Sequence, residues 1–196
     1  MNKIIVLVEG YAHPNPDGSY AASPTTTLID TGDKKILVDP GTNKEKLLES
    51  LKIQSLSVED ISFIYLSHYH PDHFLNIRLF PDVDIYDGGT RWSGDKEYFH
   101  ERFLPNTDIE ILKTPGHSPE DASLLVKTDM GLICIAPDVF WWEDGKQKSG
   151  TIDELLKLDD PFATDKEALL ISRKLVLSKS DFIIPGHGKM FKTPTL

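Results

Sequence analysis

Cysteine and long apolar segments are nearly absent from this sequence. Cys134 is the only cysteine, so an internal disulfide is impossible and a reducing compartment, the cytoplasm, is the expected location. No segment reaches the roughly 20 apolar residues that a transmembrane helix requires. Residues 1–8 have neither the length nor the cleavage signal of a secretory peptide. We therefore expect neither a disulfide-stabilised nor a membrane protein.

Positive charge is also in short supply. The 21 lysines and arginines stand against 31 aspartates and glutamates, which gives a formal net charge of -10. This balance opposes nonspecific binding to a nucleic-acid backbone, although bound divalent cations would make a site locally positive, so a nuclease is not excluded. The sequence has no Gly-x-Ser-x-Gly motif, and its one cysteine lies in a predicted strand, which disfavours covalent hydrolysis by serine or cysteine.

The remaining composition is that of a globular domain. A chain of 196 residues with 39% hydrophobic and 27% charged residues predicts one domain, residues 1–196. Thr42 and Thr164 resemble capping residues of two helices, the second with Ala168, Ile171 and Leu175 facing inward. Residues 11–24 are expected to form a loop that borders a pocket. Strands are predicted at residues 1–8, 25–30, 35–39, 61–66, 83–86, 109–113, 123–127, 132–136 and 182–184.

A cluster of metal-type side chains follows the strand at residues 61–66. The segment His68-Tyr-His70-Pro-Asp72-His73 places three imidazoles and a carboxylate within six positions. Imidazole and carboxylate groups suit zinc, iron or manganese, and a strand-to-helix turn with this spacing can serve two metals. The segment therefore predicts a metal site rather than an ordinary surface loop.

Three further donors follow other predicted strands. They are His117 in Thr114-Pro-Gly-His, Asp138 in Pro137-Asp, and His187 in Pro185-Gly-His-Gly. Glycine before His117 and on both sides of His187 permits tight turns that direct these side chains toward a shared centre. Each histidine alone would most often be structural, but their order and positions predict one site.

This order of motifs resembles the metallo-β-lactamase superfamily from Thr25 to Gly188. The resemblance implies an αββα four-layer sandwich, with Asp39 supporting the ligand loop. More narrowly, Asp138-Val-Phe140, Ser172-Arg-Lys174 and Pro185-Gly-His-Gly188 look like the small proteins grouped with metallo-β-lactamase domain-containing protein one. The superfamily resemblance also implies that His68, His70 and His117 bind one metal, that Asp72, His73 and His187 bind the second, and that Asp138 bridges them.

The sequence departs from the family pattern at two places. Leu75 stands where glycine is usual after the histidine motif, and Ala136-Pro137 precede Asp138 where a glycine is usual. Neither departure removes a donor. We expect the two departures to shift the start of the helix and the bridging loop slightly, and so to affect the spacing of the metals.

The resemblance implies a hydrolase in which a hydroxide bridging two divalent metals attacks an ester, lactone, thioester or phosphodiester. Zinc is the expected metal, with manganese or iron as alternatives. Asp72 is the candidate for orienting the hydroxide or moving its proton. The expected partner is a small molecule, and the aromatic and histidine candidates for the pocket wall are His13, Tyr20, Tyr69, Trp92, Phe140, Trp141 and Trp142.

Other functions stay open at this level. An RNA endonuclease of the same fold is one, although the acidic balance and the lack of a basic stretch oppose it. An iron-dependent oxidoreductase similar to persulfide dioxygenases is another, because imidazole and carboxylate sites accept iron. A noncatalytic binding module is disfavoured by the complete donor set. Trp141 and Trp142 could serve a homodimer contact if they form an exposed patch.

Overall fold

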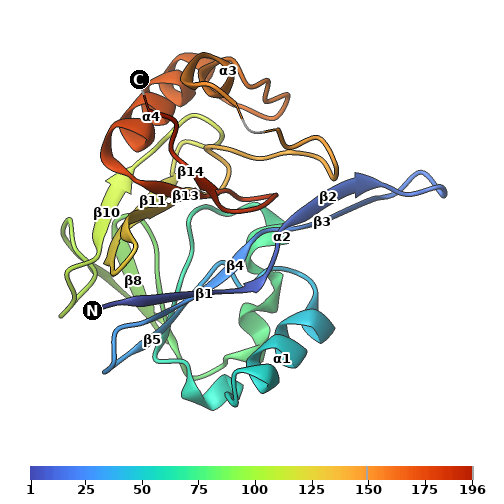
Figure 1. The fold of residues 1–196 in the computed structure, drawn as a ribbon. Coiled ribbons are helices and arrows are strands. Elements are labelled where there is room, and N and C mark those ends of the chain that lie inside the picture. The colour runs from blue at the N-terminus through green and yellow to red at the C-terminus, as the bar shows by residue number, and fades with distance from the viewer. Residues whose placement is uncertain (149, 196) are drawn as a thin grey trace.

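The computed structural model describes residues 1–148 and 150–195, and it places two β-sheets back to back with helices outside them (Figure 1). The larger sheet has seven strands in the order β1-β4-β5-β6-β7-β8-β9. Their bounds are β1 (Lys3–Val8), β4 (Thr26–Asp30), β5 (Lys35–Val38), β6 (Phe63–Tyr65), β7 (Asp84–Tyr86), β8 (Thr90–Ser93) and β9 (Lys96–Phe99).

The smaller sheet has five strands in the order β10-β11-β12-β13-β14. They are β10 (Glu110–Lys113), β11 (Ala122–Thr128), β12 (Gly131–Ile135), β13 (Phe182–Ile184) and β14 (Phe191–Lys192). A separate hairpin pairs β2 (Tyr11–Pro14) with β3 (Tyr20–Ser23). The helices are α1 (Lys44–Ile53), α2 (Pro71–Phe74), α3 (Ile152–Leu156) and α4 (Lys166–Lys179), with 3-10 turns η1 (Val58–Asp60) and η2 (Leu75–Leu79).

Side-chain alternation along the strands gives the sheets two buried faces each. In β5, Ile36 and Val38 face the second sheet while Leu37 faces α1. In β12, Ile133 and Ile135 likewise face the first sheet. Cys134, which lies between them in the strand, packs on the α4 side. Because successive strand side chains point to opposite faces, a nearly continuous apolar run covers both faces of a sheet.

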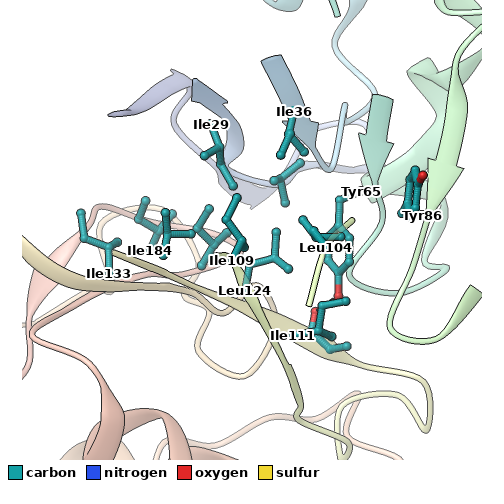
Figure 2. Close-up of a cluster of buried hydrophobic side chains, with 14 of the residues drawn as sticks. Ile29, Ile36, Tyr65, Tyr86, Leu104, Ile109, Ile111, Leu124, Ile133 and Ile184 are labelled. Carbon is teal, nitrogen blue, oxygen red and sulfur yellow. Dashed lines mark hydrogen bonds between the residues drawn. The ribbon is translucent and has the colours of Figure 1, made fainter. Parts of the chain in front are cut away.

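Three hydrophobic clusters mark the three interfaces between the layers. The central cluster joins the two sheets, and Figure 2 shows Ile29 and Ile36 of the first sheet facing Leu124, Ile133 and Ile184 of the second. The other clusters seat α1 on the first sheet and α4 on the second. The order of layers is therefore αββα, which confirms the predicted fold class.

The parallel pairing of strands brings several strand ends to one edge. β12 and β13 are parallel, and β10 runs in the same direction because two antiparallel pairings separate it from β12. In the first sheet, β5, β6 and β7 are parallel. Segments that follow β6, β10, β12 and β13 can therefore meet at this edge, which is where loops of such sheets carry function.

Two local predictions were wrong. Residues 11–24 form the hairpin β2–β3 rather than a loop, and it projects past α2 (Figure 1). The hairpin has no alternating apolar pattern, since only Ala12 and Ser23 of its eight strand residues are buried, and Asp144 fixes it by accepting from the Ala12 backbone N–H at 3.0 Å. The inward face of α4 was also misjudged, since Ile171 is 67% exposed. Its buried residues are Leu169, Ser172, Arg173 and Val176.

The helix caps lie one residue later than predicted. Asn43, not Thr42, caps α1 by accepting from the Lys46 backbone N–H, and Asp165, not Thr164, caps α4 by accepting from two backbone N–H groups. Both residue types are good caps, because a short polar side chain reaches the free N–H groups of the first turn. Among the described helices, none is long and apolar enough to cross a bilayer.

The layer assignment makes a stability prediction. Leu124 is fully buried in the central cluster, so Leu124→Ala should lower the free energy of unfolding by about 2–5 kcal/mol through lost burial and the cavity left behind. Ile171→Ala on the exposed face of α4 is the control and should change it by less than about 0.5 kcal/mol. Urea unfolding of both variants measures this, and equal losses would contradict the assignment.

Candidate metal centre

The seven predicted donors meet at the strand-end edge. His68 lies three residues after β6, and His70 is the N-cap of α2, which carries Asp72 and His73 on its short helical turn. His117, Asp138 and His187 follow β10, β12 and β13. Pro71 at the first position of α2 favours the turn, because its missing N–H would have no partner there.

The donors fall into two groups, and within each group the candidate ligand atoms lie within 4.8 Å of one another. The first donor group is His68, His70, His117 and Asp138, and the second donor group is Asp72, His73 and His187. This division matches the one that the family resemblance implies. The roles of these residues as ligands stay a prediction, whereas their convergence is a property of the structure.

The carboxylate of Asp138 lies between the two groups. Its Oδ2 is 3.1 Å from Nε2 of His117 and 3.5 Å from Nε2 of His73. On the other side, its Oδ1 is 3.8 Å from Nε2 of His187. Asp138 therefore reaches donors of both groups, as a bridging ligand must.

Each buried imidazole is also held from its far side. Nδ1 of His117 lies 2.8 Å from Asp160, and Nδ1 of His73 lies 2.8 Å from Asp39. Nδ1 of His68 lies 3.3 Å from Asp121, and the Tyr11 carbonyl lies 2.9 Å from Nδ1 of His187. Such partners fix the ring orientation and leave Nε2 free to face the centre.

Several buried atoms at the centre lack a partner. Nε2 of His68, Nε2 of His73 and Oδ1 of Asp138 are buried and have no hydrogen bond within the described part of the chain. A buried polar atom without a partner costs about 1–3 kcal/mol, so these atoms call for a group that they can bind. Two divalent cations fit, because the free atoms are imidazole nitrogens and a carboxylate oxygen.

Neighbouring charges set the protonation of the candidate donors. Burial opposes protonation of His117, but hydrogen bonds with Asp138 and Asp160 raise its pKa to about 10. Burial also opposes the charge of Asp138, yet the neighbouring His73 and His187 keep the pKa of its carboxyl well below its usual range. The cluster is therefore an anion surrounded by imidazoles that compete for protons.

The two departures from the family pattern leave the donors in place. Leu75 is 44% exposed at the C-terminal end of α2, so its side chain makes no demand on the site. Pro137 begins a tight turn in which the Phe140 backbone N–H donates to the Pro137 carbonyl. Glycine is needed instead at Gly186, where a Cβ would lie 1.8 Å from Oδ1 of Asp138.

The predicted wall residues have mixed outcomes. Tyr20 and Trp141 line the cavity beside the donors, whereas Phe140 lies in the core. Trp142 packs against Phe191, and Trp141 and Trp142 are both buried, so they form no exposed patch for a dimer. The remaining candidates His13, Tyr69 and Trp92 are absent from the residues that line this cavity.

Sequence reasoning missed Asp121, Asp160 and Phe162. Phe162 lines the cavity, and the two aspartates hold His68 and His117. In the sequence, the charges of Lys157-Leu-Asp-Asp160 look like those of a solvated loop, and Phe162 follows two residues later. Pro161 and Phe162, which directly follow these charges, were the sequence signal that this segment is more than a solvated loop.

Comparison with known proteins decides the family. The model of the metallo-beta-lactamase superfamily matches residues 20–128. The chain belongs to the metallo-beta-lactamase superfamily. The predicted resemblance is thus confirmed. The matched residues run from β3 to β11 and include the donors from His68 to His117.

Relatives within the superfamily extend the similarity along the whole chain. Metallo-beta-lactamase domain-containing protein 1 of Xenopus laevis is 31% identical over 97% of this chain and 82% of its own length. An N-acyl homoserine lactonase of Bacillus cereus is 27% identical over 74% of this chain and 63% of its own. A metallo-beta-lactamase structure from Thermotoga maritima has a TM-score of 0.71 at 18% identity, covering 97% of this chain and 99% of that one.

Superfamily membership and the donor set together make the chain a metal-dependent hydrolase. The two donor groups correspond to a binuclear centre.

The protonation of the centre makes metal binding depend on pH. Because a ligand imidazole must be neutral and its surroundings raise the pKa of His117 to about 10, zinc binding at pH 7 should release protons and tighten as pH rises. Calorimetric zinc titration in two buffers of different ionisation enthalpy measures the protons released. A binding enthalpy that is the same in both buffers would contradict the prediction.

Proposed function

We propose that this chain hydrolyses an uncharged carboxylic ester or lactone that carries an apolar group, with two divalent metal ions, zinc by preference. The observation that carries the proposal is the cavity over the donors. It measures about 390 Å³, within the size range of small-molecule sites. The lining consists of Ala12, Tyr20, Ala22, His70, Pro71, Asp72, His117, Asp138, Trp141, Phe162 and His187.

The walls of the cavity supply apolar contact and no positive side chain. Above the donors, Trp141 and Phe162 lie with ring centroids 5.6 Å apart, and Tyr20 of the hairpin adds a third ring. Among the described residues that line the cavity, none is lysine or arginine. An anionic group away from the metals would lose water without gaining a charged partner, so neutral substrates are favoured.

The same absence weakens the phosphodiester alternative. Proteins bind nucleic-acid backbones mainly through lysine and arginine contacts to phosphates, and the net charge of this chain is -10. A small phosphodiester could reach the metals, but the residues that line the cavity offer the flanking phosphates of an RNA chain no lysine or arginine. Carboxylic substrates therefore rank above RNA.

Among the seven candidate donors, Asp72 has a second role in the proposed reaction. Two divalent cations held by these residues would lower the pKa of a water molecule and polarise the carbonyl oxygen of the substrate. Asp72 has a side chain 24% exposed, and its Oδ2 lies 3.4 Å from Nε2 of His187. Burial alone would raise its pKa, but the hydrogen bond with His187 lowers it, so Asp72 is a carboxylate at neutral pH that can accept a proton.

Aromatic rings of the wall position the substrate. Phe162 is 59% exposed and therefore free to contact an entering molecule, whereas Trp141 is largely buried behind it. An acyl or alkyl chain held against these rings would bring its ester carbonyl toward the donors and exclude water from them. The relative's lactonase activity supports a substrate of this kind, since that protein is named for N-acyl homoserine lactones.

A matched substrate pair tests the charge preference. The zinc-loaded protein should hydrolyse p-nitrophenyl hexanoate with a kcat/KM at least about tenfold above that of p-nitrophenyl adipate, whose far methyl is replaced by a carboxylate. An alkyl γ-lactone should be cleaved, and bis(p-nitrophenyl) phosphate much more slowly. The Asp138→Ala variant is the background control, and a preference for the adipate or phosphate would contradict the proposal.

Elemental analysis of the same preparations tests the metal. We expect two divalent ions per chain, reduced together with hydrolysis in Asp138→Ala, because Asp138 reaches both donor groups. Iron in the protein with no hydrolysis of any substrate would instead favour an iron-dependent oxidoreductase.

Phe162→Ala tests the apolar wall. It should lower kcat/KM for p-nitrophenyl hexanoate about tenfold while leaving p-nitrophenyl acetate nearly unchanged, since only the longer chain reaches the ring. Phe99→Ala is the matched control, because Phe99 is 84% exposed on the edge strand β9, outside the cavity lining. An equal loss with both esters would show that the ring does not contact the acyl chain.

A further inference from the structure

The inner face of α4 carries two buried polar residues that the proposed reaction does not use. Ser172 is 1% exposed and Arg173 is 3% exposed, and both lie between the apolar residues Leu169 and Val176. Arginine is almost never fully buried without a partner, because its charge loses water. The position therefore needs a reason beyond packing.

Arg173 joins two loops of the metal centre. Its Nε donates to the Val139 carbonyl at 3.0 Å, and its Nη1 donates to the Leu158 carbonyl at 2.5 Å. Val139 directly follows the bridging candidate Asp138. Leu158 lies two residues before Asp160, whose carboxylate is 2.8 Å from Nδ1 of His117.

The planar guanidinium explains why arginine stands here. Its donors point in fixed directions, so one side chain can bond two carbonyls from different loops, which an ammonium on a flexible stem does less well. The guanidinium also lies 5.8 Å from the ring centre of Phe140, which adds a cation–π contact. Its Nη2 is buried without a hydrogen bond inside the described regions, so the two carbonyl bonds are what this buried charge gains.

A second contact of α4 reaches the same donor group. The Ser172 hydroxyl donates to the Pro115 carbonyl at 2.7 Å, two residues before His117. Between them, Gly116 packs so closely on the helix that a Cβ would lie 2.3 Å from the Leu169 backbone. Helix α4 thus fixes the backbone next to two members of the first donor group, His117 and Asp138.

The second donor group is held by other elements. Asp72 and His73 belong to α2, and His73 is oriented by Asp39 at the end of β5. His187 is oriented by the Tyr11 carbonyl in the hairpin. The two groups share Asp138, but only the first also depends on α4 through His117.

We propose that Arg173 is a positioning residue for the first donor group: its two carbonyl bonds hold Asp138 and Asp160 in place and thereby set the affinity of that group for its metal ion. The inference rests on the two-metal part of the proposed function and not on the substrate. Arg173 is itself neither one of the candidate donors nor one of the residues that line the cavity.

Zinc affinity measured separately for the two groups tests this. In a His73→Ala background, which disables the second donor group, Arg173→Met should weaken zinc binding by about tenfold, the lower end of the range for residues that support metal ligands. In a His70→Ala background, which disables the first, the same change should matter by less than about threefold. Competition with a chelating dye measures each constant, so loss of hydrolysis with normal zinc binding would count only against the proposed substrate.

Further variants separate positioning from general destabilisation. Val176→Ala removes buried apolar atoms from the same helix and should lower the unfolding temperature without changing either zinc constant. Arg173→Lys, which keeps the charge but not the two-pronged geometry, should give an intermediate constant and serves if the methionine variant fails to fold. The proposal is overturned if both groups weaken equally, if Val176→Ala has the same effect, or if neither arginine variant changes the first constant.

Discussion

The attraction between the Asp138 carboxylate and the imidazoles around it is the contact on which the site depends. Four ring nitrogens, one each from His68, His73, His117 and His187, lie 3.1 to 3.8 Å from its oxygens. Without the carboxylate, these rings would crowd one another in a buried space where like charges repel strongly. The strand order of both sheets, the turn at α2 and the absence of a side chain at Gly186 all serve to bring these groups together.

An outer ring of acceptors gives this arrangement its precision. Asp39, Asp121 and Asp160 each face the far nitrogen of a different histidine, and each comes from a different part of the chain. Asp39 lies at the end of β5 with φ of 47°, a conformation uncommon for residues other than glycine. Backbone held in such a conformation at a site indicates that the surrounding contacts over-determine it.

The sequence predicted that the seven candidate donors converge because they occur in short motifs immediately after strands, and the family resemblance of those motifs implied the order of the layers. It did not reveal the supporting contacts, because these join residues far apart in the chain, such as His117 with Asp160. The hairpin β2–β3 was not predicted because each of its strands has only one buried residue, Ala12 or Ser23, so no apolar alternation marks it. Arg173 and Ser172 were recognised as a motif, but polar residues on an inner helix face contradict the amphipathic pattern from which that face was inferred.

The cavity wall is assembled from three segments, and this has an evolutionary consequence. Tyr20 belongs to the hairpin, Trp141 follows β12, and Phe162 lies before α4, whereas most donors sit on the short segments at the strand ends. The hairpin is tied to the body at its base by Asp144, through side-chain and backbone bonds to Ala12. Replacement of its tip, or of the ring at position 162, would reshape the substrate space without moving a donor. Lineages with this fold can thus diverge in substrate while inheriting an unchanged metal centre.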